Sequence, residues 1–434
     1  MTKTIDIIGG GVSGLACAYY AHKNLPNHKI RLWEKDGTAG GLASTFNTGE
    51  YTIEKFYHHM FRRDEALQEL ISDCGLSHEL QWKPAATGSY YLQKAYRLSS
   101  PLDLLKFKPL SFISRIRVGF LALHARTIKN WQDLDDLTAR EYVEKIAGKE
   151  VWKIMWEPLF KGKFGKYADD VSAAWLWSKL VDRGSSRNSS GFEYLGYLKG
   201  GLGRIFQHII SELELAGHEI NLGETVHSLL IDNSIINKIQ TSKGDFNTDI
   251  VISCVQTPQL AAMISENTNL WKRLSKIEFL SNVCLVMELN QSLSSFYWTN
   301  ITDTSAPFVG VIEQTKWTGI EEYNDHHIAY ISSYVTPDDK RLNMSEKELF
   351  NYYYPFLLKM FPHFKHEHLE KLYLWKAPYA QPIVHRGYRN DVPDTTTEFQ
   401  NLYICSMAQI YPNDRQVSNG IERAKRTIEL IKTR

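Results

Sequence analysis

The sequence predicts an α/β fold that opens with a strand, a helix and a second strand of a parallel sheet. Three observations carry this prediction. An apolar run at 4–8 reads as a buried strand, the glycine pattern at 9–14 follows at once, and a helix is expected over 12–23. A second strand, 29–33, then delivers Glu34 at its carboxyl end. This order of elements is typical of a Rossmann-like dinucleotide-binding unit.

Each residue of the glycine pattern has a separate expected task. Gly9 permits the tight turn, Gly11 lets the backbone approach a pyrophosphate, and Gly14 lets the helix lie close to the strand. The helix start around Ser13 directs its N–H groups and positive dipole end at the phosphates. The Glu34 carboxylate is placed to accept hydrogen bonds from the adenosine ribose and disfavours a 2′-phosphate.

A second glycine pair, Gly40-Gly41, follows the second strand and the residues from Lys35 onward. In this respect the chain resembles the flavoprotein superfamily of amine oxidases, protoporphyrinogen oxidase, phytoene desaturases and UDP-galactopyranose mutase. The resemblance implies FAD as cofactor, with Lys35, Gly40, Gly41 and the backbone at Leu42 among its contacts. Leu42 stands where many relatives carry Arg, so a side-chain contact to the diphosphate is in question.

The same resemblance assigns two later positions to the cofactor. The backbone of Val226 would pair with the adenine edge. Ser406 and Met407 stand where relatives usually have Gly-Asp, so a contact to a ribityl hydroxyl is missing or replaced near Ser406. The chain shows no recognisable flavin attachment motif, and FAD is expected to be noncovalent.

The resemblance also implies how the domains follow one another. The FAD-binding domain (a flavoprotein domain of the GR2 type) is expected from three pieces, 1–100, 199–262 and 386–434. A helical insert at 101–198 would face the substrate or a membrane, and 263–385 would form the sheet of an α+β substrate domain. Alternating apolar runs in that last segment predict an antiparallel sheet with one face buried. Its expected elements are strands near 283–289, 308–312 and 328–334 and a helix at 346–360.

The insert carries three readable patterns. Segment 101–131 is amphipathic and basic, which fits either a solvated helix face or a contact with anionic lipid. Thr138 and Glu141 form a capping box that predicts a helix ending near Gly148. A run of large rings follows, and these rings would either wall a pocket or fill a helical core. The rings are Trp152, Trp156, Phe160, Phe164, Tyr167, Trp175 and Trp177. Three lysines among them, Lys161, Lys163 and Lys166, would suit a phosphate or carboxylate on the substrate.

Catalytic residues leave little trace, because flavin chemistry needs the protein mainly to position the substrate. The best candidates are His58 and His59, which the resemblance places along the flavin face. A neutral imidazole there would relay a proton or hydrogen-bond the ring; the alternative is that both histidines only pack. No metal site is expected, because the histidines between 363 and 368 lack supporting carboxylates or thiolates.

Composition narrows the remaining choices. With 434 residues, 43% hydrophobic residues and a net charge of +1, the chain can bury a large core and lacks the basic excess of nucleic-acid-binding proteins. Its five cysteines are scattered, as in a reducing compartment. We expect neither a secretory signal nor a spanning helix. The expected location is cytoplasmic, or peripheral at the inner face of the membrane.

Three functions stay open. The first is an FAD-dependent oxidoreductase that takes a hydride from a C–N or C–C unit of an apolar or amphipathic small molecule. The second is a non-redox flavoenzyme that resembles the UDP-sugar mutases. The third is a flavin-binding protein without catalytic activity. The substrate, the electron acceptor and the oligomeric state are not readable from the sequence.

Overall fold

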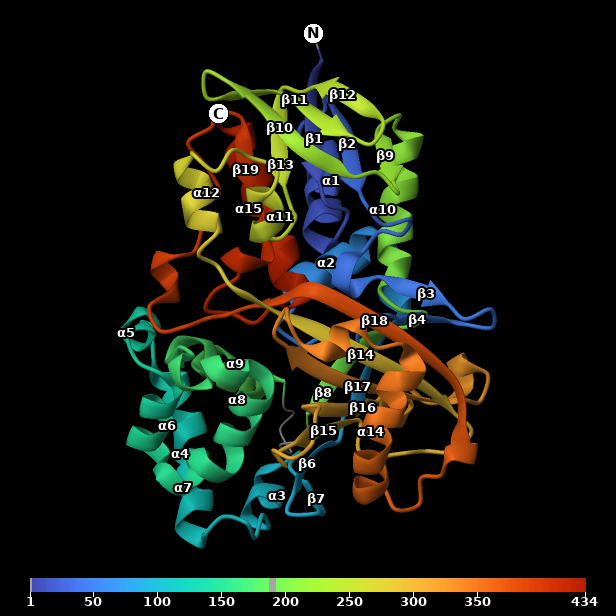
Figure 1. The fold of residues 1–434 in the computed structure, drawn as a ribbon, viewed down its shortest axis with the longest axis vertical. Helices are drawn as coiled ribbons and strands as arrows, with labels where there is room; N and C mark the ends of the chain where they lie inside the picture. The colour runs from blue at the N-terminus through green and yellow to red at the C-terminus, as the bar shows by residue number, and fades with distance from the viewer. Residues whose placement is uncertain (1, 187–192) are drawn as a thin grey trace.

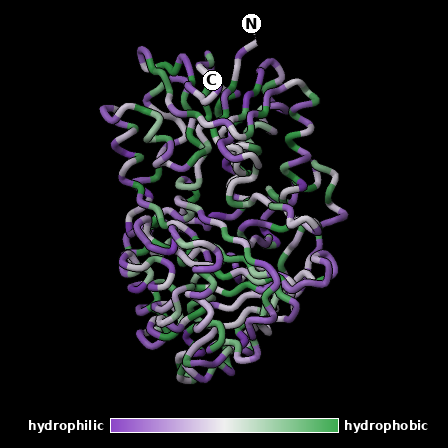
Figure 2. The backbone as a smooth tube through the Cα atoms, turned by 45° about the vertical axis from the view of Figure 1, so that its right-hand side comes forward, coloured by the Kyte–Doolittle hydropathy of each residue, from purple (hydrophilic) through white to green (hydrophobic). Residues whose placement is uncertain are grey.

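The computed structural model describes residues 2–186 and 193–434 of the chain, arranged in three parts (Figure 1). Both termini lie in a part built round a five-stranded parallel sheet. A seven-stranded sheet lies beyond it, and a group of helices from the middle of the chain lies beside that second sheet. Figure 2 shows apolar stretches running through the interior, while strongly hydrophilic stretches lie mainly at the periphery.

The five-stranded sheet combines strands from distant stretches of the chain. All its neighbouring pairs are parallel, and Ile7 faces Leu32 on one side and Ile252 on the other. Strand, glycine turn, helix and strand follow each other as predicted. In spatial order the strands are β19 (Leu402–Ile404), β13 (Ile250–Ser253), β1 (Lys3–Ile8), β2 (His28–Glu34) and β9 (Glu219–Leu222).

Apolar layers cover this sheet on both faces. Helix α1 is buried continuously from Gly14 to Ala21, and its small residues let α15 and α10 approach closely. The apolar side of α15, including Ile421 and Ile428, is buried against it, as predicted. One face carries α1 (Val12–Asn24), α2 (Glu65–Asp73), α10 (Gly203–Leu215) and α15 (Val417–Lys432). The other carries β10 (Val226–Asp232), β11 (Ile235–Thr241), β12 (Gly244–Asn247), α11 (Thr257–Ala261) and α12 (Asn269–Leu274).

The seven-stranded sheet is antiparallel except where β15 and β6 run parallel. Strands β6 and β7 belong to the first hundred residues, which the sequence analysis assigned to the cofactor domain; here they complete the edge of the larger sheet. In spatial order the strands are β18 (Leu369–Pro382), β14 (Phe279–Leu289), β17 (His327–Val335), β16 (Gly310–Glu313), β15 (Trp298–Ile301), β6 (Thr87–Tyr91) and β7 (Lys94–Arg97).

The prediction that only one face of this sheet is buried was wrong for β14, the second strand from one edge, because all eleven residues of β14 are buried. Helix α14 (Glu346–Met360) covers one face. Aromatic residues from the segment between Tyr51 and Phe61, together with Tyr197 and Trp317, cover the other. Two short ladders accompany them: β3 (Thr45–Asn47) with β4 (Thr52–Glu54), and β5 (Leu80–Pro84) with β8 (Tyr194–Leu198).

The helical part packs round an apolar cluster that also includes residues from the start of β14 and from 383–408. The predicted capping box is confirmed: the Thr138 hydroxyl accepts from the Glu141 N–H at 3.2 Å, and Glu141 accepts from the Thr138 N–H at 2.8 Å. Helix α6 ends at Gly148, as predicted. None of the described helices is long and apolar enough to span a bilayer. The helices are α3 (Pro101–Leu105), α4 (Phe112–Thr127), α5 (Gln132–Asp135), α6 (Ala139–Ala147), α7 (Lys149–Val151), α8 (Glu157–Phe164) and α9 (Ala173–Ser185), with a π-helical turn at Trp152–Trp156.

Candidate active site

All three parts of the fold line one cavity of about 1790 Å³. A ligand pocket commonly has about 300–1,000 Å³, so this volume suits a dinucleotide and a substrate together. Among the candidate residues of the sequence analysis, Gly14 and Ser406 lie outside the lining. The others line it together: Gly9, Gly11, Ser13, Glu34, Lys35, Gly40, Gly41, Leu42, His58, His59 and Val226.

The two glycine segments form one end of the cavity without side chains between them. The Gly40 N–H donates to the Gly10 carbonyl at 2.8 Å, and Gly11 pairs with Gly40 as a parallel bridge. A Cβ on Gly41, at a φ of 57°, would lie 3.1 Å from the Gly11 Cα. The space between the segments therefore exists because both lack side chains, which fits the close backbone approach that a diphosphate requires.

Gly14 supports this turn from behind. A Cβ there would lie 1.8 Å from the Gly9 carbonyl oxygen, so only glycine lets α1 begin this close to the turn. The helix has no side-chain cap at Gly11 and no acid in its first turn, within a segment that is fully described. Its first N–H groups thus remain suited to an anion at the helix start.

Glu34 closes the same end of the cavity and is 7% exposed. Its carboxylate accepts from the Gly10 N–H at 2.7 Å and from the Asp36 N–H at 2.9 Å. Burial raises the pKa of Glu34, and these two backbone donors oppose the rise. Each carboxylate oxygen retains acceptor capacity, so Glu34 can also accept hydrogen bonds from the two hydroxyls of a ribose.

Ser406 lies beneath the cavity and not in its lining. It is 1% exposed, and its N–H donates to the Gln409 side chain at 2.9 Å at the start of a short 3₁₀ turn, η9 (Met407–Gln409). The neighbouring Met407 lines the cavity instead. An apolar thioether thus stands at this position, where it offers contact area and only a weak acceptor.

The two candidate histidines line the middle of the cavity and are held by different partners. His58 Nδ1 donates to the Phe56 carbonyl at 2.7 Å, which leaves Nε2 without the proton in the neutral ring. His59 Nδ1 lies 3.0 Å from the Tyr297 hydroxyl. Burial lowers the pKa of His58 to about 4 and that of His59 to about 3, with Arg183 adding to the second shift. Both imidazoles are therefore neutral at physiological pH.

A charged cluster also lines the cavity, near enough to His58 and His59 to contribute to their pKa shifts. Burial lowers the pKa of Lys163 to about 7 and that of Lys179 to about 8. Burial would raise the pKa of Asp414, but Lys179, Lys163 and Arg415 outweigh it and hold this pKa well below its usual range. Lys179 pairs with Asp414, and Arg415 donates to the Tyr334 hydroxyl at 3.0 Å. The cluster offers cationic groups to an otherwise largely apolar space.

Lys163 is one of the three lysines that the sequence predicted to suit an anionic group, whereas Lys179, Asp414 and Arg415 were not predicted. Lysines 161 and 166 are exposed and do not line this cavity. The missed residues come from α9 and from the loop before α15, more than two hundred positions apart, and the neighbouring Asp-Arg pair before the last helix is the one local sign of them.

The aromatic run serves both expected purposes. Trp156, Phe160, Phe164 and Trp175 line the cavity, while Trp152 is 2% exposed in the core of the helical part. The ammonium of Lys163 lies 4.7 Å from the ring centroid of Trp175. The rings thus wall the pocket and anchor a lysine in it.

Residues 12–416 match the model of the family described as flavin containing amine oxidoreductase. The chain belongs to this family. Membership confirms the predicted resemblance and FAD as the cofactor, and the cradle just described fits it.

Relatives and solved structures agree on the fold. The coproporphyrinogen III oxidase of Staphylococcus aureus is 29% identical over 184 residues, which cover 40% of this chain and 38% of that protein. The match thus spans about two fifths of this curated relative. A putative protoporphyrinogen oxidase from Exiguobacterium sp. 255-15 superposes with a TM-score of 0.80 at 19% identity, covering 100% of this chain and 99% of the other. Reduced UDP-galactopyranose mutase gives 0.75 at 16% identity, with 99% and 96% covered.

Proposed function

We propose that this protein is an FAD-dependent oxidoreductase that removes a hydride from a C–N or C–C unit of an amphipathic substrate carrying an anionic group. The observation that carries the proposal is the continuity of the cavity. It runs from the glycine cradle past His58 and His59 to a wall of aromatic rings. When bound, FAD supplies the hydride acceptor. Gly9, Gly11 and Glu34 would then bind FAD, and the residues of the aromatic wall would hold the substrate beside it.

The composition of the cavity lining supports this class of substrate. Most of the wall beyond the histidines is apolar or aromatic, which favours a large apolar body. Lys163 and Lys179 lie in the same lining, and with Arg415 they outnumber the one carboxylate, Asp414, that they share. A carboxylate or phosphate on the substrate would neutralise this excess. Binding it would also keep Lys163 protonated, because an opposite charge raises a lowered lysine pKa.

We assign His58 and His59 two tasks, which are to position the substrate and to accept a proton from it. Because both rings are neutral, they carry no positive charge that would compete with Lys163 for an anionic group. His58 keeps Nε2 free as an acceptor, so it is the stronger candidate to receive a proton as the hydride leaves. His59, hydrogen-bonded to Tyr297, is placed to orient the substrate.

Anaerobic reduction of the bound flavin tests the reaction. The purified holoprotein is mixed without oxygen with anionic and neutral amphiphiles, and the flavin band near ~450 nm is followed. Porphyrinogens, for which the similar curated oxidases are named, come first in the panel. We expect an anionic amphiphile to bleach the band. Turnover of a UDP-sugar only after chemical reduction would favour the mutase function instead, and no response to any compound would leave a flavin-binding protein without catalysis.

Two lysine variants test whether the substrate carries an anionic group. Lys163→Met should raise KM for the bleaching substrate about 10- to 100-fold and change kcat little, since a charge-assisted contact contributes about 1.5–3 kcal/mol. Lys161→Met, two residues earlier on α8, is the matched control, because this exposed lysine pairs with Glu157 outside the cavity. Equal KM values for both variants would remove the anionic group from the proposal.

We propose further that α3 and α4 rest on an anionic membrane. Their outer side exposes large apolar side chains, and some of these also line the outer end of the cavity, so a substrate could pass between lipid and site. Lys106, Lys108 and Arg117 flank this side with positive charge. The exposed residues are Leu102, Leu105, Phe112, Ile113, Ile116, Phe120 and Leu123.

Vesicle sedimentation tests this contact. Vesicles that contain phosphatidylglycerol should carry the protein down at low salt, and Phe112→Ser with Phe120→Ser should release it. Leu215→Ser is the control, because Leu215 is 89% exposed on α10 in another part of the fold. If the double variant still sediments like the unchanged protein, α3 and α4 do not form the contact.

A further inference from the structure

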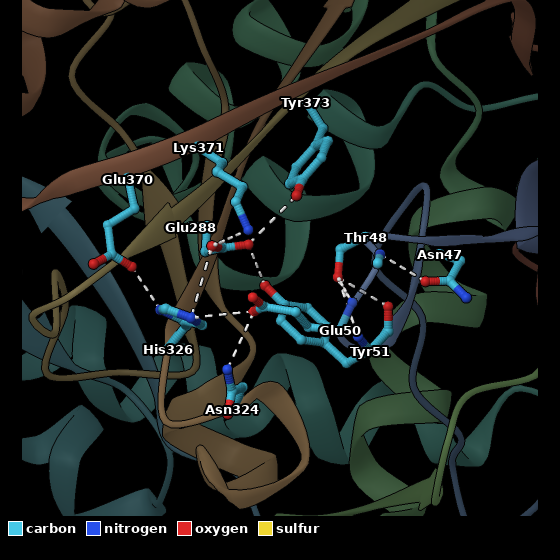
Figure 3. Close-up of polar contacts among 11 residues, drawn as sticks. Asn47, Thr48, Glu50, Tyr51, Glu288, Asn324, His326, Glu370, Lys371 and Tyr373 are labelled. Atoms are coloured by element: carbon cyan, nitrogen blue, oxygen red, sulfur yellow. Dashed lines mark hydrogen bonds and ion pairs between the residues drawn. The ribbon is translucent and has the colours of Figure 1, made fainter.

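A polar cluster lies at an end of the seven-stranded sheet, outside the cavity (Figure 3). Glu288 comes from β14, His326 directly precedes β17, and Glu370 comes from β18. Glu50 and Tyr51 reach the cluster from the turn between β3 and β4. The function proposed above does not use these residues, because none of them lines the cavity.

Glu288 is the buried centre of the cluster. Its side chain is 1% exposed, and Oε2 accepts from the Tyr51 hydroxyl at 2.5 Å and from the Tyr373 hydroxyl at 3.4 Å. Among the described residues Oε1 accepts no hydrogen bond. It forms an ion pair with the Lys371 ammonium at 3.2 Å, and His326 Nε2 lies 3.8 Å away. One oxygen is thus held by two hydroxyls, while the other is directed at cations.

His326 is oriented by one carboxylate toward two others. Its Nδ1 lies 2.5 Å from Glu370 Oε2, a distance at which Nδ1 donates its proton to the carboxylate. Nε2 then faces Glu50 Oε2 at 3.6 Å and Glu288 Oε1 at 3.8 Å. A carboxylate that fixes Nδ1–H so that Nε2 points at a metal is the usual outer support of a metal-bound histidine.

The spacing suits an ion between these atoms. Zinc binds nitrogen and oxygen ligands at about 2.0–2.2 Å in tetrahedral geometry, which separates two ligand atoms by roughly 3.3–3.6 Å. The two separations at Nε2 are 3.6 and 3.8 Å. Glu288, His326 and Glu370 offer ligand atoms that all lie within 4.8 Å of one another, a set that does not include Glu50. Asn324 donates to Glu50 at 3.2 Å and holds that carboxylate toward the same point.

We propose that this cluster binds one divalent transition-metal ion, of which zinc is the type. Its ligands are His326 Nε2 and Glu288 Oε1. Glu50, whose side chain is 44% exposed, moves its Oε2 closer to complete the set, and Glu370 orients the histidine. Three carboxylates face a single lysine here, so the cluster has an excess of negative charge that a divalent ion reduces. Lys371, whose side chain is 44% exposed, swings into solvent as the ion binds. The ion ties the β3–β4 turn to the large sheet, and the chain continues from β4 to His58 and His59.

Zinc titration of the chelator-treated, full-length holoprotein tests the site. We expect one equivalent of Zn²⁺ to bind by calorimetry and to raise the apparent Tm. His326→Gln should weaken binding at least tenfold. His366→Gln is the matched control, because this histidine lies in a different exposed turn and should leave affinity unchanged. Binding that survives His326→Gln, or that is lost in His366→Gln, would overturn the proposal.

The variant Lys371→Met supplies a second test, in which zinc affinity should rise where His326→Gln lowers it. If the ammonium competes with the ion for Glu288, its removal should tighten zinc binding several-fold and make the Tm depend more strongly on zinc. A purely structural ion pair predicts a lower Tm that zinc does not restore. No zinc binding by either the unchanged protein or Lys371→Met rules the site out. Flavin content and bleaching serve as separate readouts, so failure here leaves the proposed oxidoreductase function unaffected.

Discussion

Replacing Gly14 by alanine should damage the cofactor site although alanine favours a helix. Gly14 lies in the first turn of α1, where propensity alone would favour alanine by about 1 kcal/mol. The added Cβ would lie 1.8 Å from the Gly9 carbonyl oxygen, whereas such atoms normally stay roughly 3.3 Å apart or more. Turn and helix must therefore separate by well over an ångström, and overpacking of this kind costs about 1–3 kcal/mol.

This separation opens the glycine cradle, so we expect FAD to bind about 10- to 100-fold more weakly, with 1.4 kcal/mol for each factor of ten. Fluorescence titration of flavin-free protein gives the Kd, and urea unfolding gives the free energy. Gly119→Ala in α4 is the control: a Cβ there meets nothing within 4 Å, so it should stabilise by up to about 1 kcal/mol and leave the Kd unchanged. Unchanged FAD affinity in Gly14→Ala would refute the reasoning.

Three further changes follow from the same structure. Glu34→Ala leaves the Gly10 and Asp36 N–H groups without their acceptor and should weaken FAD binding about tenfold or more, measured by flavin release on dilution. Because burial lowers the pKa of His58 to about 4, against 6.5 in the unfolded chain, the unfolded state binds more protons between these pH values. The free energy of unfolding should therefore fall as pH drops from 6.5 to 4, and less so in His58→Phe; equal slopes in urea denaturation would contradict this. Ile428→Ala removes a fully buried side chain of α15 and should cost about 2–4 kcal/mol by the same method, whereas Leu215→Ala should stay within ~0.5 kcal/mol.

The cofactor end of the molecule was predictable because its signals are local. Gly9, Gly11 and Glu34 lie within one βαβ unit, where the order of strand, turn and helix fixes their relative positions. The same holds for the capping box at Thr138. Local backbone rules, without tertiary information, suffice for such features.

The substrate end was predictable only in part, because its residues meet through tertiary packing. Lys179 and Asp414 form their ion pair across 235 positions. The polar cluster outside the cavity shows the same property, because Glu288 meets Tyr51 across 237 positions. No periodicity in the sequence connects such positions. The second buried face of β14 was missed for the same reason: the aromatic residues that cover it come from other segments.

The order of strands in the parallel sheet has a consequence for synthesis. β1, at the amino end, pairs with β13, and β13 pairs with β19, whose last residue is Ile404. Helix α15, which covers α1, ends at Lys432. A ribosome must therefore translate through β19 and α15 before the parallel sheet and its helical cover are complete, so the finished nucleotide pocket depends on segments that are made more than 350 residues after β1.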